Sequence, residues 1–395
     1  MLPQKKYTLH VGFSGFPDTS ASVQRVLLTF KGLQLLNEHP LVINKISHYP
    51  FKNKNFVGRY EGVPFIYTSI LNFKPTNFVK RNLNKVSGYF GEIKFLFKKR
   101  NQIKTLVLYS TYFAEYPYYF ILSKLLGSKL LIQHVEMFSS MSYRSSTFTK
   151  LNDQLIEKNI SKLCHGVIAI SDVLKNDAIA ISSKTPVIKI PAMCDFDSMA
   201  HLNKTQVPIP YLMYCGSIGY IEVVEFIIDV FEQLCAQNLY NGNLLMVISG
   251  QHTTNWEILY TKINGLAVKS NIKIKSNIPR EELITDYKSA DMLLIPLRQT
   301  IQDAARFPHK IGEYTASKRP IVTTNVGEIK NYFTDGVSAI VVNEYSVPAY
   351  VAKIGEYALS NEKLNAMGNK GFEIGLANFD YKNQAKALQQ FIHQL

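Results

Sequence analysis

Three cations and a carboxylate gather in one short part of the chain. The stretch FPHKIGEYTASKRPIVTTNVGE, residues 307–328, predicts a helix with Pro308 at its first position, then a turn and a short apolar strand. Arg298, Arg306 and Lys310 would surround the start of this helix, although a helix N-terminus favours anions. A diphosphate held between the cations and the backbone N–H groups would resolve the conflict. Solvated surface charges are the alternative.

Two further groups lie at the same predicted edge. Glu313 is three residues beyond Lys310 on the same helix face, where its carboxylate is placed to accept hydrogen bonds from a ribose diol. The alternative for Glu313 is a solvated helix glutamate. The following strand ends in TTNVGE, so Gly327 and Glu328 begin another helix whose N–H groups are placed to meet a phosphate or a sugar hydroxyl.

Alternating strands and helices position these groups. Short apolar strands are predicted at YTLHVGF, TLVLYS, KLLIQHV, GVIAIS and VIKIP in the first half, and at YLMYCG, LLMVISG, DMLLIPL, PIVTTN and AIVV in the second. Amphipathic helices such as IEVVEFIIDVFEQLCAQ separate them. This pattern predicts an α/β fold with parallel sheets and right-handed crossovers.

A polar, aperiodic stretch with two prolines, residues 194–211, predicts a linker between two domains. We therefore expect two doubly wound Rossmann-like domains, residues 1–195 and 205–377, facing a central cleft. The C-terminal helix, at about 378–395, is expected to pack back on the first domain. Ligands of such sheets bind beyond the carboxyl ends of the strands.

A glycine loop follows the first strand of the second half. In CGSIGYIEVVE, Gly216, Ser217 and Gly219 are placed to cradle a phosphate, although a plain tight turn explains the same residues. No Lys or Arg occurs in residues 211–261. Neutralising a phosphate would therefore fall to the three cations above or to Arg25 of the first half.

The first half offers its own polar strand ends. The loop GFSGFPDTSASVQRVLL contains Gly15 among small residues that allow close backbone approach before a helix. LLIQHVEMFSS places His134 and Glu136 at the end of another strand, where Glu136 would orient His134 or bind an acceptor hydroxyl. Structural roles, a strand-to-helix turn and a buried histidine, are the alternatives.

The net charge of +14 is confined to the first half. Residues 1–200 have 26 Lys plus Arg against 12 Asp plus Glu, whereas residues 201–395 have 18 of each. Residues 73–104 alone have nine Lys or Arg, one acid and interleaved phenylalanines. Such a segment predicts contact with an anionic membrane surface. The alternatives are a solvated basic face over buried aromatics, or a nucleic acid, for which no motif is present.

Other classes of site find little support. The four cysteines have no CxxC spacing and fit buried, reduced thiols, and no cluster has metal-ligand spacing. Asp195 and Asp197 resemble a DxD metal motif but fall in the linker. We find no signal peptide and no apolar run of the roughly 18 residues that a bilayer span needs.

Several of these motifs together resemble nucleotide-sugar glycosyltransferases with the two-domain GT-B fold, in the retaining family GT4. They are residues 307–328, REELITDYKSADMLLIPL upstream, CHGVIAIS with VIKIPAMCDFDSM, and ANFDYKNQAKALQQFI at the end. The resemblance implies that Glu313 holds the nucleotide ribose, that the loop containing Gly15 reaches the donor phosphates, and that His134 lies near the transferred sugar. The family's sugar-holding glutamate would fall at Ala305 and is absent, which makes Asp303 or Gln302 its expected replacement.

The expected function is transfer of a sugar from a nucleotide-diphosphate donor to a glycan or lipid-linked acceptor in surface polysaccharide or glycoconjugate assembly. The resemblance implies retention of configuration. We expect neither a metal nor another cofactor, since no cluster has metal-ligand spacing. The reduced cysteines fit a cytoplasmic enzyme, and the basic segment 73–104 predicts contact with the inner face of a membrane. A nucleotide-sugar epimerase of the same architecture and an inactive sugar-binding or scaffold protein are the alternatives.

Overall fold

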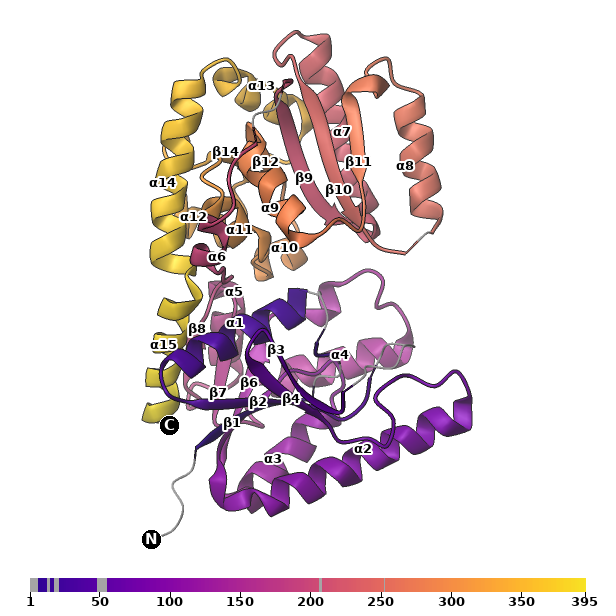
Figure 1. Ribbon diagram of the computed structural model, residues 1–395, viewed down its shortest axis with the longest axis vertical. Helices are drawn as coiled ribbons and strands as arrows, with labels where there is room; N and C mark the ends of the chain where they lie inside the picture. The colour runs from indigo at the N-terminus through magenta and orange to yellow at the C-terminus, as the bar shows by residue number, and fades with distance from the viewer. Residues whose placement is uncertain (1–5, 13–14, 18–20, 48–54, 206–207, 252) are drawn as a thin grey trace. The chain divides into compact units, whose positions relative to one another are not determined.

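The computed structural model describes residues 6–12, 15–17, 21–47, 55–205, 208–251 and 253–395. The chain divides into two compact units, which we call the first unit (residues 1–193 and 381–395) and the second unit (residues 194–380). Each is an α/β unit built on a largely parallel sheet, which confirms the predicted fold class (Figure 1).

The first unit contains an eight-stranded sheet in the order β3-β4-β2-β1-β5-β6-β7-β8. All neighbouring strands are parallel except β3 and β4. The strands are β1 (Tyr7–Val11), β2 (His39–Asn44), β3 (Val57–Tyr60), β4 (Val63–Tyr67), β5 (Ile103–Leu108), β6 (Lys129–His134), β7 (Gly166–Ala169) and β8 (Val187–Lys189). The central strands are apolar and buried, as expected for a sheet covered on both faces.

Helices cover both faces of this sheet. One apolar core joins it to α1 and α15, and another joins it to α2, α3 and α4. The helices are α1 (Ala21–Leu35), α2 (Phe78–Lys98), α3 (Glu115–Leu126), α4 (Thr147–Asn159), α5 (Asp172–Ile181) and α15 (Tyr381–Gln394), with short 3₁₀ turns η1 (Arg100–Gln102) and η2 (Phe138–Ser140).

The C-terminal helix α15 packs against α1. A Cβ atom on Gly32 of α1 would lie 2.4 Å from the Cβ of Ala385, so glycine permits this close approach. Gln389 donates to Glu38, whose carboxylate also lies 3.1 Å from His393. The end of the chain thus belongs to the first unit.

The second unit contains a six-stranded, fully parallel sheet in the order β11-β10-β9-β12-β13-β14. The strands are β9 (Tyr211–Ser217), β10 (Asn243–Ser249), β11 (Ile272–Lys275), β12 (Met292–Ile295), β13 (Ile321–Thr324) and β14 (Ile340–Val342). The helices are α6 (Phe196–Ala200), α7 (Ile221–Ala236), α8 (Thr254–Asn264), α9 (Arg280–Ser289), α10 (Ile301–Ala305), α11 (Lys310–Ala316), α12 (Ile329–Tyr332), α13 (Val347–Tyr357) and α14 (Asn361–Phe379), with η3 (Ile218–Tyr220) and η4 (Lys269–Asn271).

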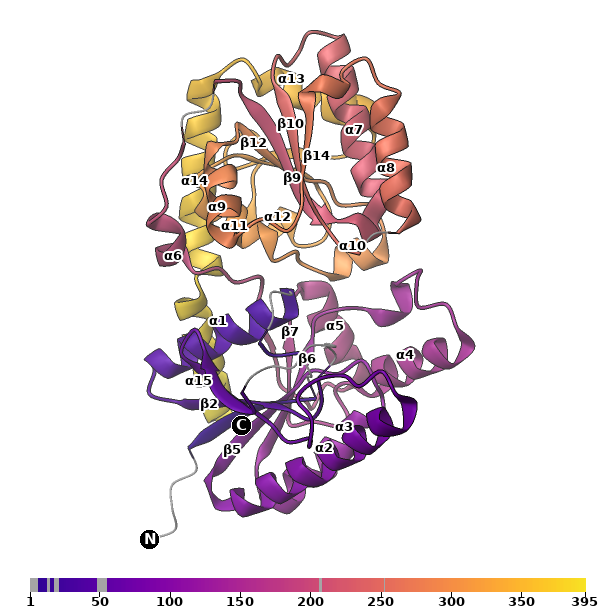
Figure 2. The ribbon, with the colours of Figure 1, turned by 45° about the vertical axis from the view of Figure 1, so that its right-hand side comes forward.

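The core of the second unit unites the sheet with α7, α8 and α13, and Figure 2 shows α7 and α8 together beside the sheet. The predicted linker differs from expectation because it contains α6. The Asp195 side chain accepts a hydrogen bond from the N–H of Ser198 and so caps this helix. A capping role explains Asp195 without any metal.

Candidate functional site

The loops after β9, β12 and β13 form the carboxyl edge of the second-unit sheet. The three strands are neighbours, so their loops are brought to one edge although they lie far apart in the sequence. These loops contain the glycine loop after β9, the cations Arg298 and Arg306, and the Gly327 turn. Helix α11, with Lys310 and Glu313, follows the β12 loop.

Two arginines of this edge share one buried carboxylate. The Arg298 guanidinium donates from Nε to Oδ2 of Asp303 at 3.0 Å and from Nη2 to Oδ1 at 3.1 Å. Arg306 Nη2 lies 2.7 Å from Oδ1 of the same residue, whose side chain is 0% exposed. The hydrogen bonds that Arg298 donates to Asp303 are the main cause that raises the pKa of Arg298 above its usual value. One carboxylate therefore leaves the pair of guanidiniums with one excess positive charge.

The other contacts of the two guanidiniums are weaker or neutral. Arg298 Nη1 donates to Glu222 at 3.2 Å, but the Glu222 side chain is 76% exposed, so water screens that pair. Arg306 Nη1 donates to the Tyr220 hydroxyl at 2.8 Å, and its guanidinium lies 4.8 Å from the Tyr220 ring centroid. Tyr220 therefore positions Arg306 without neutralising it.

These contacts bear on the expected role of Asp303. Both of its oxygens accept hydrogen bonds or ion-pair contacts from arginines, and its backbone N–H donates to the hydroxyl of Thr300, the N-cap of α10. Ala305, where the resemblance expects a glutamate, is buried with 0% exposure. Asp303 is thus the shared counter-ion of Arg298 and Arg306, and its expected role in holding the transferred sugar stays a prediction.

Lys310 is the first residue of α11 and is partly exposed. The helix begins two residues after Pro308, with His309 as its N-cap, so the proline lies before the helix and not at its first position. Lys310 is close enough to Cys215, near the end of β9, to oppose the rise in the pKa of that thiol that burial causes. Lys310 thus lies at the start of α11 and near the end of β9.

Glu313 forms an ion pair that the sequence did not reveal. Arg280, the first residue of α9, donates from Nη1 to Oε1 of Glu313 at 2.8 Å. Burial lowers the pKa of Arg280, but the Glu313 carboxylate outweighs burial and raises it above the usual value. The sequence separation of 33 between the partners hides the pair from any local pattern. Arg280 holds the carboxylate in place at one oxygen.

The glycines of this edge differ in whether the backbone and its neighbours leave room for a Cβ atom. Gly327 has φ of 58°, and a Cβ there would lie 2.6 Å from the carbonyl oxygen of Ala304, so the turn itself requires glycine. Gly219 has neither constraint, because the nearest atom to its Cβ position is Ser217 Oγ at 3.5 Å. The open space above Gly219 is available to a ligand. Gly216 is buried within β9, and Glu328 is buried beside the Gly327 turn.

In the first unit, the structure contradicts the expected role of Arg25. Its side chain is buried, and its guanidinium donates to the carbonyls of Pro191 at 3.0 Å and Ile190 at 2.8 Å. Burial lowers the pKa of Arg25 to about 10. Arg25 joins α1 to the segment after β8 and is not available to a phosphate. Its place in an amphipathic helix pattern gave no sign of this.

The loop expected to contact phosphate through Gly15 is described in part. Phe13, Ser14 and residues 18–20 lie outside the described residues, and Gly15 is buried. Asn44 fixes the next residue, because its amide donates to the Phe16 carbonyl at 2.8 Å and accepts from the Phe16 N–H at 3.2 Å. The end of β2 therefore holds this loop.

His134 ends β6 and is 1% exposed. Its Nε2 lies 3.1 Å from Oδ2 of Asp177 on α5, so Asp177 orients the ring where Glu136 was expected to do so. Glu136 lies close enough to Tyr109 to add to the effect of burial, which raises the pKa of that phenol to about 12. His134 and Glu136 thus both lie at the carboxyl edge of the first-unit sheet, and His134 is oriented by Asp177.

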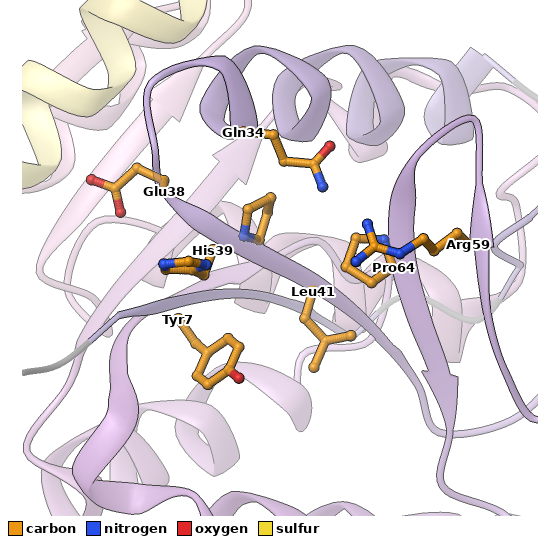
Figure 3. A pocket seen from close by; sticks show the side chains of 8 residues that line it. Tyr7, Gln34, Glu38, His39, Leu41, Arg59 and Pro64 are labelled. Carbon is orange, nitrogen blue, oxygen red and sulfur yellow. The ribbon is translucent and has the colours of Figure 1, made fainter. Parts of the chain in front are cut away.

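A pocket of about 320 Å³ lies at the opposite, amino edge of the first-unit sheet (Figure 3). Tyr7 and His39, the first residues of β1 and β2, line it with Arg59 and Pro64. Parallel sheets bind ligands at their carboxyl edge, so this pocket is remote from the candidate site.

Within the described residues, no group of three or more His, Cys, Asp or Glu is arranged to hold a metal ion. No helix of the described chain is both long enough and apolar enough to cross a bilayer.

Residues 203–374 match the family model described as Glycosyl transferases group 1. This match lies within the second unit, where the candidate site is. Comparison with curated protein sequences found no match.

Solved structures share the fold of the whole chain. Sucrose-phosphate synthase from Thermosynechococcus elongatus aligns with a TM-score of 0.75 at 15% identity, over 99% of this chain and 98% of that chain. HepE from Anabaena, in complex with UDP-glucose, aligns with a TM-score of 0.69 at 12% identity, over 99% and 100%. A glycosyltransferase from Rickettsia africae aligns with a TM-score of 0.70 at 15% identity, over 99% and 98%.

Identities this low show a common fold alone, whereas the family match carries the activity. Together they confirm the predicted resemblance at the level of the fold and the enzyme class. The chain is a glycosyltransferase with the GT-B fold, and residues 203–374 of its second unit match the group 1 family model.

Proposed function

We propose that the chain transfers a sugar from a nucleotide-diphosphate donor to a hydroxyl of a glycan or lipid-linked acceptor, with retention of configuration as in family GT4. The observation that carries the donor proposal is the pair of guanidiniums at the carboxyl edge of the second unit that is held by one buried carboxylate. Arg298 and Arg306 share a single buried carboxylate, and Lys310 adds another cation. HepE, which has the same fold, binds UDP-glucose.

The diphosphate would lie among these three cations, beside the open space above Gly219. Electrostatic stabilisation of a leaving phosphate is commonly the largest catalytic contribution of such a site. In the proposed reaction the bond between the anomeric carbon and the phosphate oxygen breaks, and the acceptor oxygen bonds to that carbon. The acceptor proton passes to a phosphate oxygen of the leaving group, so no protein base is needed. Asp303 acts by holding the arginines.

The nucleotide ribose would bind at Glu313, whose Oε1 is fixed by Arg280. We expect Glu313→Ala to weaken binding of the donor by about 1–3 kcal/mol, because charged hydrogen bonds to the ribose are lost. The measurement is calorimetric titration with the nucleotide sugar that best stabilises the protein in a panel of UDP-, GDP- and ADP-sugars. A panel that leaves the melting temperature unchanged throughout would contradict the proposed donor class.

A control separates Glu313 from its partner. Arg280→Ala and the double variant complete a cycle with Glu313→Ala. If Glu313 touches the ribose, its removal weakens binding even when Arg280 is absent. Unchanged donor affinity in folded Glu313→Ala would contradict the assignment.

For the first unit, we expect His134→Ala to lower turnover about tenfold or more while free nucleotide binds with unchanged affinity. His134 lies on the first unit, whereas the nucleotide is proposed to bind mainly on the second, and loss of a side chain that positions a reacting sugar lowers the rate. Steady-state rates and calorimetry with nucleoside diphosphate give the two readings. A large loss of nucleotide affinity in the folded variant would show that His134 has another role.

A further inference from the structure

Helix α2 has its apolar side facing solvent. The residues that it buries are Asn84, Gly88, Glu92 and Leu96, of which one is a large apolar residue. Its exposed side includes apolar residues at helical spacing, namely Val79, Leu83, Val86, Phe90 and Phe97. Leu83 is 58% exposed and Phe90 is 70% exposed. A surface helix normally has the opposite arrangement, so this face is organised to contact something outside the unit.

Close backbone contacts prevent α2 from rotating to bury these residues. A Cβ on Gly88 would lie 2.1 Å from the carbonyl oxygen of Lys45, and a Cβ on Gly91 would lie 2.1 Å from that of Thr68. These two glycines let the helix backbone rest directly on the chain after β2 and β4. Rotation would replace the glycines with bulkier residues at both contacts.

Polar contacts fix the same orientation. The Asn84 side chain accepts from the Leu71 N–H at 2.8 Å and donates to the Leu71 carbonyl at 3.0 Å. The Glu92 carboxylate accepts from the Tyr119 hydroxyl at 2.8 Å and from the Tyr118 hydroxyl at 3.2 Å. These bonds would be lost if the buried and exposed faces exchanged places.

The charges around the apolar face have one sign. Lys80, Lys85, Lys94 and Lys98 are exposed on α2. Residues 73–104 contain nine Lys or Arg and one acidic residue, Glu92, which is fully buried. The outward face of α2 therefore presents lysines and apolar groups, without a carboxylate of this segment to balance them.

We propose that α2 docks on an anionic lipid bilayer, lying in its plane with the apolar residues among the acyl chains and the lysines at the headgroups. Lysines beside an apolar stripe fit this interface in both hydrophobicity and charge. A second copy of the chain fits less well, because two such faces would bring like charges together. Figures 1 and 2 show α2 along the outside of the first unit, and its 21 residues make a long contact line. The inference does not depend on the proposed donor or acceptor.

The first test is co-sedimentation of the full chain with vesicles of phosphatidylglycerol and phosphatidylcholine, and with vesicles of phosphatidylcholine alone. We expect binding that requires the anionic lipid and falls with salt. The double variant Leu83→Ser with Phe90→Ser should bind about tenfold or more weakly, since each CH₂ that leaves the bilayer reduces partitioning several-fold. Each of Lys80→Gln and Lys94→Gln should reduce binding to anionic vesicles about fivefold.

The matched control replaces two exposed apolar residues of the second unit, Val337→Ser with Leu359→Ser, which are 52% and 85% exposed. This control should bind vesicles like the unaltered chain. Equal binding by both double variants would overturn the proposal. So would a folded α2 variant that binds vesicles normally but loses self-association in ultracentrifugation, which would identify a second copy as the occupant.

A second measurement reports insertion directly. Trp256 is the only tryptophan of the chain and is buried in the second unit, so it contributes a constant background. Phe90→Trp places a reporter in the stripe, and its emission should shift to the blue and be quenched by brominated lipid on anionic vesicles. An unshifted, unquenched emission while the protein is vesicle-bound would overturn the role of α2. Nucleotide binding is measured in a separate experiment, so failure of the proposed nucleotide binding would not change the vesicle-binding result.

Discussion

Replacing Asp303 with asparagine is expected to lower the free energy of unfolding by about 3 kcal/mol. The substitution keeps the shape of the side chain but leaves Arg298 and Arg306 facing each other without their shared anion. Breaking a buried ion pair typically costs 3–5 kcal/mol, and the partial exposure of both arginines places the expectation at the lower end. Urea denaturation of the unliganded chain measures the loss.

The same variant distinguishes two roles for Asp303. If Asp303 only orients the arginines, a nucleoside diphosphate should raise the melting temperature of Asp303→Asn by more than that of the unaltered chain, because phosphate replaces the missing anion. If Asp303 binds the transferred sugar, affinity for the nucleotide sugar should fall while that for the nucleoside diphosphate is kept. Glu373→Gln, which removes an exposed partner of Lys370, is the control and should change stability by less than about 0.5 kcal/mol.

The strands that hold the site were predictable from sequence, because buried parallel strands are short apolar runs and alternation with helices predicts that they are parallel. All ten predicted strands correspond to observed ones. Strands β3 and β11 lie at the two ends of their sheets, where VGRY and IKIK mix apolar and polar residues. VGRY and IKIK lack the continuous apolar run that identified other strands, and neither was predicted. The internal strands β2 and β4 were not predicted either, whereas the edge strands β8 and β14 were.

The pairing of the charged residues was not predictable to the same degree. The sequence placed Arg298 and Arg306 near one helix start but could not show that Asp303 is buried between them. Arg280 reaches Glu313 across 33 residues, so only the packing of α9 against α11 brings them together. Arg25 fitted the expected charge balance, whereas the structure uses its guanidinium for two backbone carbonyls. The sign of each charge can be read from the sequence, whereas the partner of each charge is set by the fold.

We expect Lys310→Ala to weaken binding of the nucleoside diphosphate ten- to a hundredfold. This range corresponds to loss of a charge-assisted hydrogen bond, about 1.5–3 kcal/mol. The matching nucleoside lacks the phosphates and should bind with nearly unchanged affinity. Titration calorimetry with the pair of ligands provides the comparison, and Lys363→Ala, an exposed lysine on α14, is the control.

The unliganded protein supplies an independent reading of the same residue. Lys310 begins α11, where a cation opposes the partial positive charge of the helix start, so its removal should keep or slightly raise the melting temperature. A lysine that served the fold would give the opposite sign. Equal losses for nucleoside and nucleoside diphosphate would mean that Lys310 shapes the pocket without meeting phosphate. No change with either ligand would make it a solvated surface charge, and the excess charge of Arg298 and Arg306 would then have to bind the diphosphate alone.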